Sequence, residues 1–256
     1  MASVEFYQFP YMSDNYGVLL HDTQENVTAC VDCGDADAVL AALAHKNWKL
    51  DQILITHHHA DHTEGLEALK SATGAIAIGP AESASKLPGV DKHVADGDDF
   101  AFGKQRIQVM QTPGHTLDML NYYLPEAGVL FTGDTLFAMG CGRLFEGDAA
   151  TMHNSLNKIS QLPADTVLYC SHEYTLTNGS FAETVDSENP ALIERMLKVR
   201  ELRDADQPTI PTTLAEELAT NPFLRSADSG IRKSLNMESA SDLEVFTELR
   251  RRRDNH

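Results

Sequence analysis

The sequence predicts an α/β fold, with β-strands covered by helices, that is followed by a helical C-terminal part. Through residue 174, short apolar runs that end at Gly, Pro or Asp alternate with helical patterns, as in layered α/β proteins. Beyond residue 174 the apolar spacing is helical only. We therefore expect two domains, residues 1–174 and residues 175–256.

The elements of the first domain are expected in a regular order. Residues 35–46, "DADAVLAALAHK", form an amphipathic helix with Val39, Leu40, Leu43 and Ala44 on one face. Strands are expected at residues 16–20, 27–31, 51–56, 75–79, 106–112, 121–124, 128–134 and 166–174.

The second domain carries clear helix-start signals. The helix at 189–206 begins with Asn189, a favourable N-cap residue, and Pro190 at the first helical position. Residues 213–219, which start with capping-box spacing, and residues 241–254 are the other expected helices.

The composition excludes several kinds of partner. The formal net charge of −18, from 38 acidic and 20 basic residues, repels nucleic acid and anionic membranes, so neither is an expected partner. No apolar stretch reaches the roughly 18 residues that a transmembrane helix needs. The N-terminal "MASVEFYQFP" lacks the basic and apolar regions of a signal peptide. We expect a cytoplasmic monomer.

Cys30 and Cys33 form a C-x-x-C pair, which is found in metal and redox sites. Here the pair lies on a predicted strand that runs into a turn at Gly34, so side chains three positions apart point to opposite faces. We interpret these cysteines as structural.

The segment "THHHADH" directly follows the apolar run "ILI". If the backbone stays extended, His57, His59 and Asp61 point to one side and His58 to the other. His62 follows as the chain turns toward a helix. Two pairs of metal ligands result, His57 with His59 and Asp61 with His62, and these residue types suit zinc, iron or manganese.

Three later residues, His115, Asp134 and His172, also follow apolar runs and are candidates for the same site. Together the seven side chains are enough for two metal ions. One ion could take His57, His59 and His115, the other could take Asp61, His62 and His172, and Asp134 could bridge them. Such a set leaves coordination positions open, which favours a catalytic site over a closed structural zinc site.

The motif T-H-x-H-x-D-H, with G-H-T, T-G-D and S-H-E downstream, resembles the metallo-β-lactamase superfamily. Two further segments, "GDTLFAMGCGRLFEG" and "PTTLAEELATNPFLR", resemble glyoxalase II, the hydroxyacylglutathione hydrolase family, and the likeness covers essentially the whole chain. It implies an αββα sandwich followed by a helical substrate-binding domain.

The resemblance also implies an activity. Enzymes of this family hydrolyse S-D-lactoylglutathione to glutathione and D-lactate, the second step of methylglyoxal detoxification, by attack of a hydroxide that bridges two divalent metal ions. We expect Zn²⁺, with Fe or Mn as alternatives. The family's ligands correspond to the seven residues named above, with Asp134 as the bridge. Asp61 would also orient the hydroxide, so Asp61 and Asp134 are the predicted catalytic carboxylates.

The family's glutathione contacts correspond to Arg143, Phe145, Tyr174, Arg250 and Arg253. Arginine at 143 and phenylalanine at 145, where eukaryotic members have lysine and tyrosine, resemble the bacterial branch. Phenylalanine cannot donate the hydrogen bond of tyrosine, so the contribution of position 145 is open.

Helical spacing turns Arg250 and Arg253 to one side, where they can grip the carboxylates of glutathione. Arg251 and Arg252 are expected to face solvent.

Three alternatives stay open from the sequence. A glutathione persulfide dioxygenase of the same superfamily would hold one iron ion and lack the full second ligand set. A nuclease of the same fold would need a broad basic surface, which the net charge of −18 opposes. A non-catalytic metal-binding module would need no open coordination position.

Overall fold

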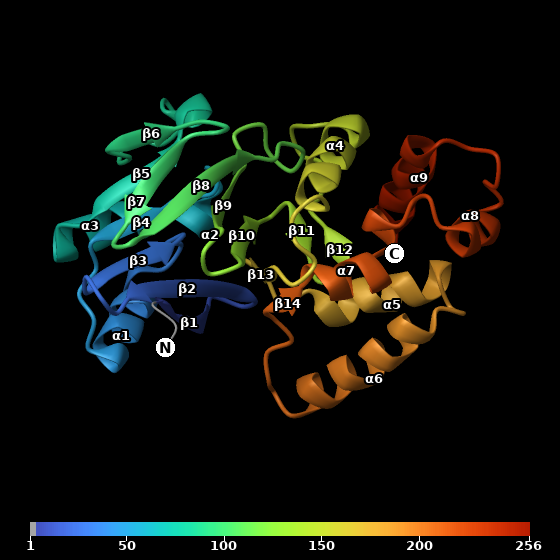
Figure 1. Ribbon diagram of the computed structural model, residues 1–256, viewed down its shortest axis with the longest axis horizontal. Coiled ribbons are helices and arrows are strands. Elements are labelled where there is room, and N and C mark those ends of the chain that lie inside the picture. The colour runs from blue at the N-terminus through green and yellow to red at the C-terminus, as the bar shows by residue number, and fades with distance from the viewer. Residues whose placement is uncertain (1–3) are drawn as a thin grey trace. The chain divides into compact units, whose positions relative to one another are not determined.

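A computed structural model describes residues 4–256 of the chain (Figure 1). The chain forms two compact units. Unit 1 comprises the residues up to Gln111 together with Asp118–Gly133, and unit 2 comprises Thr112–Leu117 together with Asp134–His256. None of the helices in residues 4–256 has the length and apolar character that crossing a bilayer requires.

The first sheet of unit 1 has its strands in chain order. The antiparallel strands are β1 (Val4–Tyr11), β2 (Asn15–Asp22) and β3 (Val27–Val31), and the strands that continue parallel to β3 are β4 (Gln52–Leu54), β5 (Ile76–Pro80) and β6 (Lys92–Val94). Parallel neighbours need crossover connections. Helix α1 (Ala36–Lys46) joins β3 to β4, and the segment from β4 to β5 includes α2 (Ala60–Thr63) and α3 (Leu66–Thr73).

Helices α1 and α3 cover one face of this sheet. Leu43 of α1 and Leu69 of α3 belong to the same buried cluster as Leu19 and Ile53 of the strands. Burying apolar side chains of this size stabilises the fold by roughly 1.5–3 kcal/mol each. The predicted helix at 35–46 is confirmed, with Asp35 as its N-cap residue.

The predicted apolar face of α1 is wrong at one position. Ala44 is exposed, and Ala42 is buried in its place.

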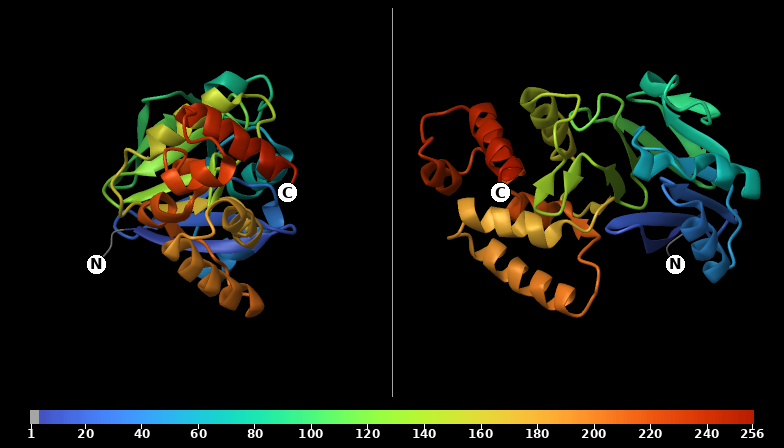
Figure 2. Two further views of the ribbon diagram at one scale, coloured as in Figure 1. Left: turned by 90° about the vertical axis from the view of Figure 1, so that its right-hand side faces the viewer. Right: turned by 180° about the vertical axis from the view of Figure 1, so that it is seen from behind.

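The second sheet of unit 1 is antiparallel and contains β7 (Asp99–Phe102), β8 (Gln105–Gln111), β9 (Leu120–Leu124) and β10 (Val129–Gly133) (Figure 2). Tyr122 of β9 is fully buried, and its hydroxyl donates a 2.6 Å hydrogen bond to the carbonyl of Ile55, just beyond β4. The rings of Phe6 and Phe131 lie 6.2 Å apart. These contacts join the two sheets face to face.

Unit 2 is mainly helical. Its helices are α4 (Ala149–Ile159), α5 (Thr175–Val185), α6 (Pro190–Asp204), α7 (Leu214–Thr220), α8 (Ser229–Leu235) and α9 (Asp242–Asp254), and its strands are β11 (Leu136–Phe137), β12 (Gly140–Cys141), β13 (Val167–Cys170) and β14 (Thr212–Thr213). β11 pairs with β12, and β13 pairs with β14.

The C-terminal helices begin where their caps predict. The Asn189 side chain accepts hydrogen bonds from the first turn of α6, and Pro190 is the first residue of that helix. Thr213 caps α7, and Ser241 forms a complete capping box with Glu244 at the start of α9. The strand β14 was not predicted, because two residues are too few to show a period.

Candidate metal centre

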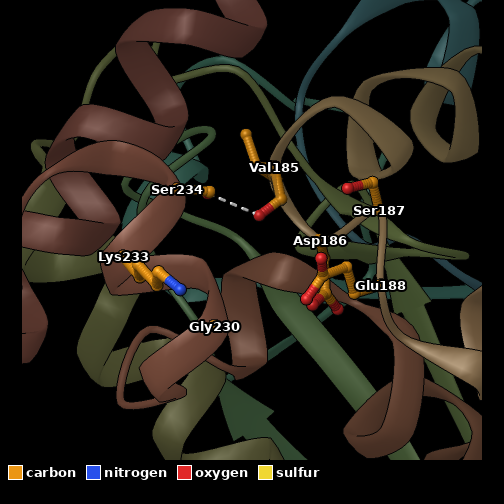
Figure 3. A pocket seen from close by; sticks show the side chains of 7 residues that line it. All are labelled: Val185, Asp186, Ser187, Glu188, Gly230, Lys233 and Ser234. Carbon is orange, nitrogen blue, oxygen red and sulfur yellow. Dashed lines mark hydrogen bonds between the residues drawn. The ribbon is translucent and has the colours of Figure 1, made fainter.

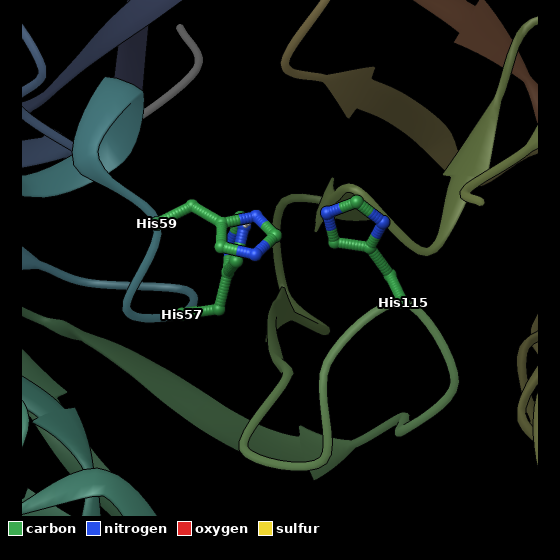
Figure 4. A group of neighbouring side chains, drawn as sticks. All are labelled: His57, His59 and His115. Carbon is green, nitrogen blue, oxygen red and sulfur yellow. Dashed lines mark hydrogen bonds between the residues drawn. The ribbon is translucent and has the colours of Figure 1, made fainter. Parts of the chain in front are cut away.

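Unit 1 places four of the predicted ligands on the connection that follows β4. The Nε2 atom of His57 lies 3.0 Å from Nδ1 of His59, and Figure 4 shows the His57 ring partly behind that of His59. Asp61 Oδ2 lies 3.3 Å from Nε2 of His62. The two predicted pairs are therefore present within this unit.

The expected backbone conformation holds for only part of this segment. His59 is extended and serves as the N-cap of α2, but Asp61 and His62 lie inside the helix. The predicted extended geometry is thus wrong for Asp61, since the helix brings it next to His62 without alternation along a strand.

Asp32, which the sequence analysis did not identify, organises this half of the site. It directly follows β3 and has a positive φ of 56°. One carboxylate oxygen accepts hydrogen bonds from His62 Nδ1 at 2.8 Å and from the Thr56 hydroxyl at 2.9 Å, while the other accepts from the Thr56 N–H at 2.8 Å. The available signal was an acidic residue at the end of a strand, just before Gly34.

His58 makes different contacts from its neighbours. Its Nδ1 lies 3.0 Å from Asp118 Oδ1, and its Nε2 lies 3.3 Å from Lys86 Nζ. This agrees with the expectation that His58 points away from the ligand pairs.

Unit 2 places the other three predicted ligands together. Asp134 lies two residues before the β11–β12 hairpin, His115 lies on the loop that follows β8 (Figure 4), and His172 lies just after β13. One Asp134 oxygen is 3.4 Å from Nε2 of His115, and the other is 3.4 Å from Nε2 of His172. The carboxylate therefore lies between two imidazoles, as a bridging ligand must.

The hydrogen-bond pattern fits metal ligands. The Arg143 carbonyl can only accept, so His115 Nδ1, 2.9 Å away, carries the proton. In a neutral ring, Nε2 then presents its lone pair to Asp134. The Asp32 carboxylate imposes the same tautomer on His62, whose Nε2 faces Asp61.

In both units two acceptor atoms thus face each other at 3.3–3.4 Å. A cation between them, whether a proton or a metal ion, removes the repulsion. A histidine oriented by a carboxylate or a carbonyl is the usual support of a metal-binding imidazole.

Three predicted substrate contacts lie around the unit 2 ligands. The Tyr174 ring stacks on His172, with centroids 4.7 Å apart and planes 3° apart. The Phe145 ring is 5.2 Å from that of His115 and is 64% exposed. Arg143 is exposed on the same loop as Phe145.

Helix α9 separates its arginines as predicted. Arg251 and Arg252 form ion pairs with Glu248 on the outer side of the helix. Arg250 is only 4% exposed, and Arg253 donates to the side-chain oxygen of Asn178.

Three guanidinium groups form a local basic patch in this acidic protein. Burial lowers the pKa of Arg253, and the neighbouring charges of Arg250 and Arg143 lower it further. The patch is defined here as Arg143, Arg250 and Arg253, and within it Arg250 also pairs with Asp254 over 2.7 Å.

A cavity of about 260 Å³ lies elsewhere in unit 2 (Figure 3). Its lining residues are Val185, Asp186, Ser187, Glu188, Gly230, Lys233 and Ser234. Asp186 is already paired with Arg225, and the Ser234 hydroxyl donates to the Val185 carbonyl over 2.6 Å. None of the predicted site residues lines this cavity.

Comparison with known proteins finds two family models that together match residues 21–256. The model of the metallo-beta-lactamase superfamily matches residues 21–172, and that of the hydroxyacylglutathione hydrolase C-terminus matches residues 173–256. The chain is 53% identical to a hydroxyacylglutathione hydrolase of Brucella anthropi, over 98% of this chain and 96% of the relative. It is 52% identical to the enzyme of Brucella ovis, over 98% of each chain.

Among solved structures, ETHE1 from Myxococcus xanthus superposes with a TM-score of 0.70 at 26% identity. The superposition covers 96% of this chain and 90% of that one.

Proposed function

Because the chain belongs to the hydroxyacylglutathione hydrolase family of the metallo-β-lactamase superfamily, we propose that it hydrolyses S-2-hydroxyacylglutathione thioesters. The preferred substrate is S-D-lactoylglutathione, and the products are glutathione and D-lactate. The observation that carries the proposal is the 53% identity over 98% of the chain. The ligand pairs of the two units support it, because they supply the residue types that this reaction needs.

The proposal includes two divalent metal ions per chain. His57, His59 and His115 hold one, Asp61, His62 and His172 hold the other, and Asp134 bridges them. The support comes from within each unit: the His57–His59 pair, the Asp61–His62 pair, and the position of Asp134 between His115 and His172. Zn²⁺ is the expected metal, and Fe and Mn suit the same donors. Bound there, the ions supply a water molecule acidified to a pKa near 7 and positive charge for the thioester oxygen.

The surrounding residues have roles of their own. Asp32 and the Arg143 carbonyl keep Nδ1 of His62 and of His115 protonated, so that Nε2 of each ring is available as a ligand. The glutathione thiol has an ordinary pKa of about 8.5, so it leaves as a thiolate without a strong general acid. This agrees with the candidate site, in which we find no obvious general acid besides the predicted ligands.

The substrate carries carboxylates, and the protein repels anions at long range. Recognition therefore depends on short-range contacts. We assign this role to the basic patch of Arg143, Arg250 and Arg253, with the Tyr174 ring beside it. Phe145 contributes apolar contact only, because its ring has no hydrogen-bond donor.

The direct experiment is incubation of the purified, metal-loaded protein with S-D-lactoylglutathione. Loss of the ultraviolet absorbance of the thioester should match the free thiol and the D-lactate that are formed. The persulfide dioxygenase alternative predicts no such loss and predicts oxygen consumption with glutathione persulfide instead. Absence of thioester hydrolysis in protein that holds two metal equivalents would refute the proposal.

A further inference from the structure

The β11–β12 hairpin, defined here as residues 136–141, connects two parts of the proposed site. Asp134, the proposed bridging ligand, lies just before it, and Arg143 lies just after it. The two ends are joined by a 3.2 Å hydrogen bond from the Gly142 N–H to the Thr135 carbonyl. The Phe137 ring packs edge-on against His172 and Tyr174. The position of this hairpin therefore sets the surroundings of Asp134 and of the substrate loop.

Side chains from the C-terminal helical region bind the hairpin backbone at five successive residues. Asn221 donates to the Phe137 and Gly140 carbonyls at 3.1 and 3.0 Å, and Glu217 accepts from the Met139 N–H at 2.8 Å. Asn178 donates to the Ala138 carbonyl at 3.1 Å, and Arg250 donates to the Cys141 carbonyl at 2.9 Å. The hairpin is too short to satisfy these groups by its own strand pairing.

The backbone at the turn needs such support. Met139 has a φ of 53°, in the left-handed region that a residue with a Cβ rarely adopts. A residue in this region costs on the order of 1 kcal/mol or more and persists only where its surroundings hold it. The hydrogen bond from the Met139 N–H to the Glu217 carboxylate provides that hold.

Glu217 is itself fixed from the other side. It is fully buried, and its second oxygen accepts from Arg195 at 2.5 Å and from the Thr212 hydroxyl at 2.9 Å. Arg195 also donates to the Thr220 hydroxyl at 2.6 Å. A buried charge pair whose remaining hydrogen bonds are all made holds one geometry, because displacing either partner leaves a charge without compensation.

We propose that Asn221 and Glu217 are positioning residues, which hold the β11–β12 hairpin so that Asp134 and the Arg143–Phe145 loop take their working positions. This inference rests on the proposed function of Asp134 and Arg143. It also reinterprets part of the basic patch. Arg250 binds the hairpin directly, and Arg253 binds it through Asn178, so the two arginines couple substrate contact to hairpin position.

Cys141 gives a readout that does not depend on activity. Its thiol is in no disulfide, 5% exposed and located on the hairpin, whereas the buried thiol of Cys30 lies on β3 of unit 1 and serves as an internal reference. Native-state alkylation, mapped by mass spectrometry, should be at least about tenfold faster at Cys141 in Asn221→Ala than in the parent protein. A tenfold rise corresponds to about 1.4 kcal/mol less free energy for local opening. The rate of alkylation at Cys30 should stay the same.

Two more variants make the test specific. Glu217→Gln keeps the side-chain volume but replaces one acceptor oxygen by a donor, so it should also accelerate alkylation of Cys141. This variant keeps the test valid even if Asn221→Ala fails to fold. Thr220→Val is the matched control, because it removes a buried partner of Arg195 without touching the hairpin. It should lower the melting temperature without changing the rate at Cys141.

Activity then tests the consequence for the site. Asn221→Ala and Glu217→Gln should lower kcat and raise KM for lactoylglutathione, whereas Thr220→Val should change neither. Equally accelerated alkylation of Cys141 in Thr220→Val would overturn the proposal. Unchanged alkylation in both Asn221→Ala and Glu217→Gln would also overturn it. Because alkylation needs no substrate, failure of the proposed positioning role and failure of the proposed reaction are distinguishable.

Discussion

A carboxylate oxygen of Asp32 accepts a hydrogen bond from Nδ1 of His62 over 2.8 Å, and both side chains are buried. The carboxylate fixes the tautomer of this histidine, so that Nε2 faces Asp61. Fixing the tautomer during folding leaves the imidazole ready to bind a metal ion.

Replacing Asp32 with asparagine should weaken metal binding while preserving the shape of the site. The new amide would donate to His62 Nδ1 and move the ring proton to Nε2, the atom that the metal needs. We expect roughly 10- to 100-fold lower affinity for the metal ion held by His62, measured by competition with a chelator.

The control is Asp51→Asn, which alters another carboxylate of unit 1, one that accepts a 2.9 Å hydrogen bond from the Thr28 N–H of β3. Equal loss of metal in the two variants would contradict an orienting role for Asp32.

The metal content of gently purified protein should approach two equivalents of Zn, Fe and Mn combined. The reason is that the chain offers two ligand sets and one carboxylate suited to bridge them. Elemental analysis checks this, and removing the metals with a chelator should abolish thioester hydrolysis until they are restored. A ceiling of one equivalent after reconstitution would favour the persulfide dioxygenase alternative.

Asp134→Ala should lower the content of both metals and nearly abolish turnover, because a bridging carboxylate serves both ions. His58→Ala is the matched control on the ligand segment, since His58 contacts Asp118 and Lys86. It should keep both metals. Loss of metal in the His58 variant together with retention in the Asp134 variant would invalidate the proposed ligand assignment.

Arg253→Ala should raise KM for lactoylglutathione more than it lowers kcat, because the proposed contact of the guanidinium is with the glutathione end, and it reaches the hairpin only through Asn178. Losing a charge-assisted hydrogen bond costs about 1.5–3 kcal/mol, which is roughly 10- to 150-fold in kcat/KM. Steady-state kinetics with lactoylglutathione and with a short thioester that lacks the glutathione peptide would measure this loss.

Arg251→Ala is the internal control, because Arg251 is exposed and paired with Glu248. Its kinetics should match those of the parent protein. With the short thioester, both arginine variants should have the same kinetics as the parent protein. Equal losses in Arg251→Ala and Arg253→Ala would show that this arginine run is only a solvated helix end.

Much of the site was predictable because its signals are local. A run of apolar residues followed by four histidines and an aspartate predicts a ligand segment before any folding is considered. The caps at Asn189, Thr213 and Ser241 likewise depend only on residues within one helical turn. The faces of α9 on which the arginines lie could be predicted from the helical period of 3.6 residues, which puts Arg251 and Arg253 on different faces.

Other features had no local signal. Helices α4, α5 and α8 were not predicted, and α5 contains Gly179 and few strong helix formers. It forms because residues such as Phe181 and Ala182 are buried by tertiary packing, which overrides weak helix propensity.

The sequence alone determined the family, the residue types of the candidate ligands and the helix that carries the arginines, because residue types and short-range spacing encode all three. Only the tertiary structure decided which groups hold the candidate ligands in place. Asp32 is 30 residues from His62, and Asn221 is 81 residues from Gly140. Such pairs share no period or motif, since their contact arises only when packing brings distant segments together.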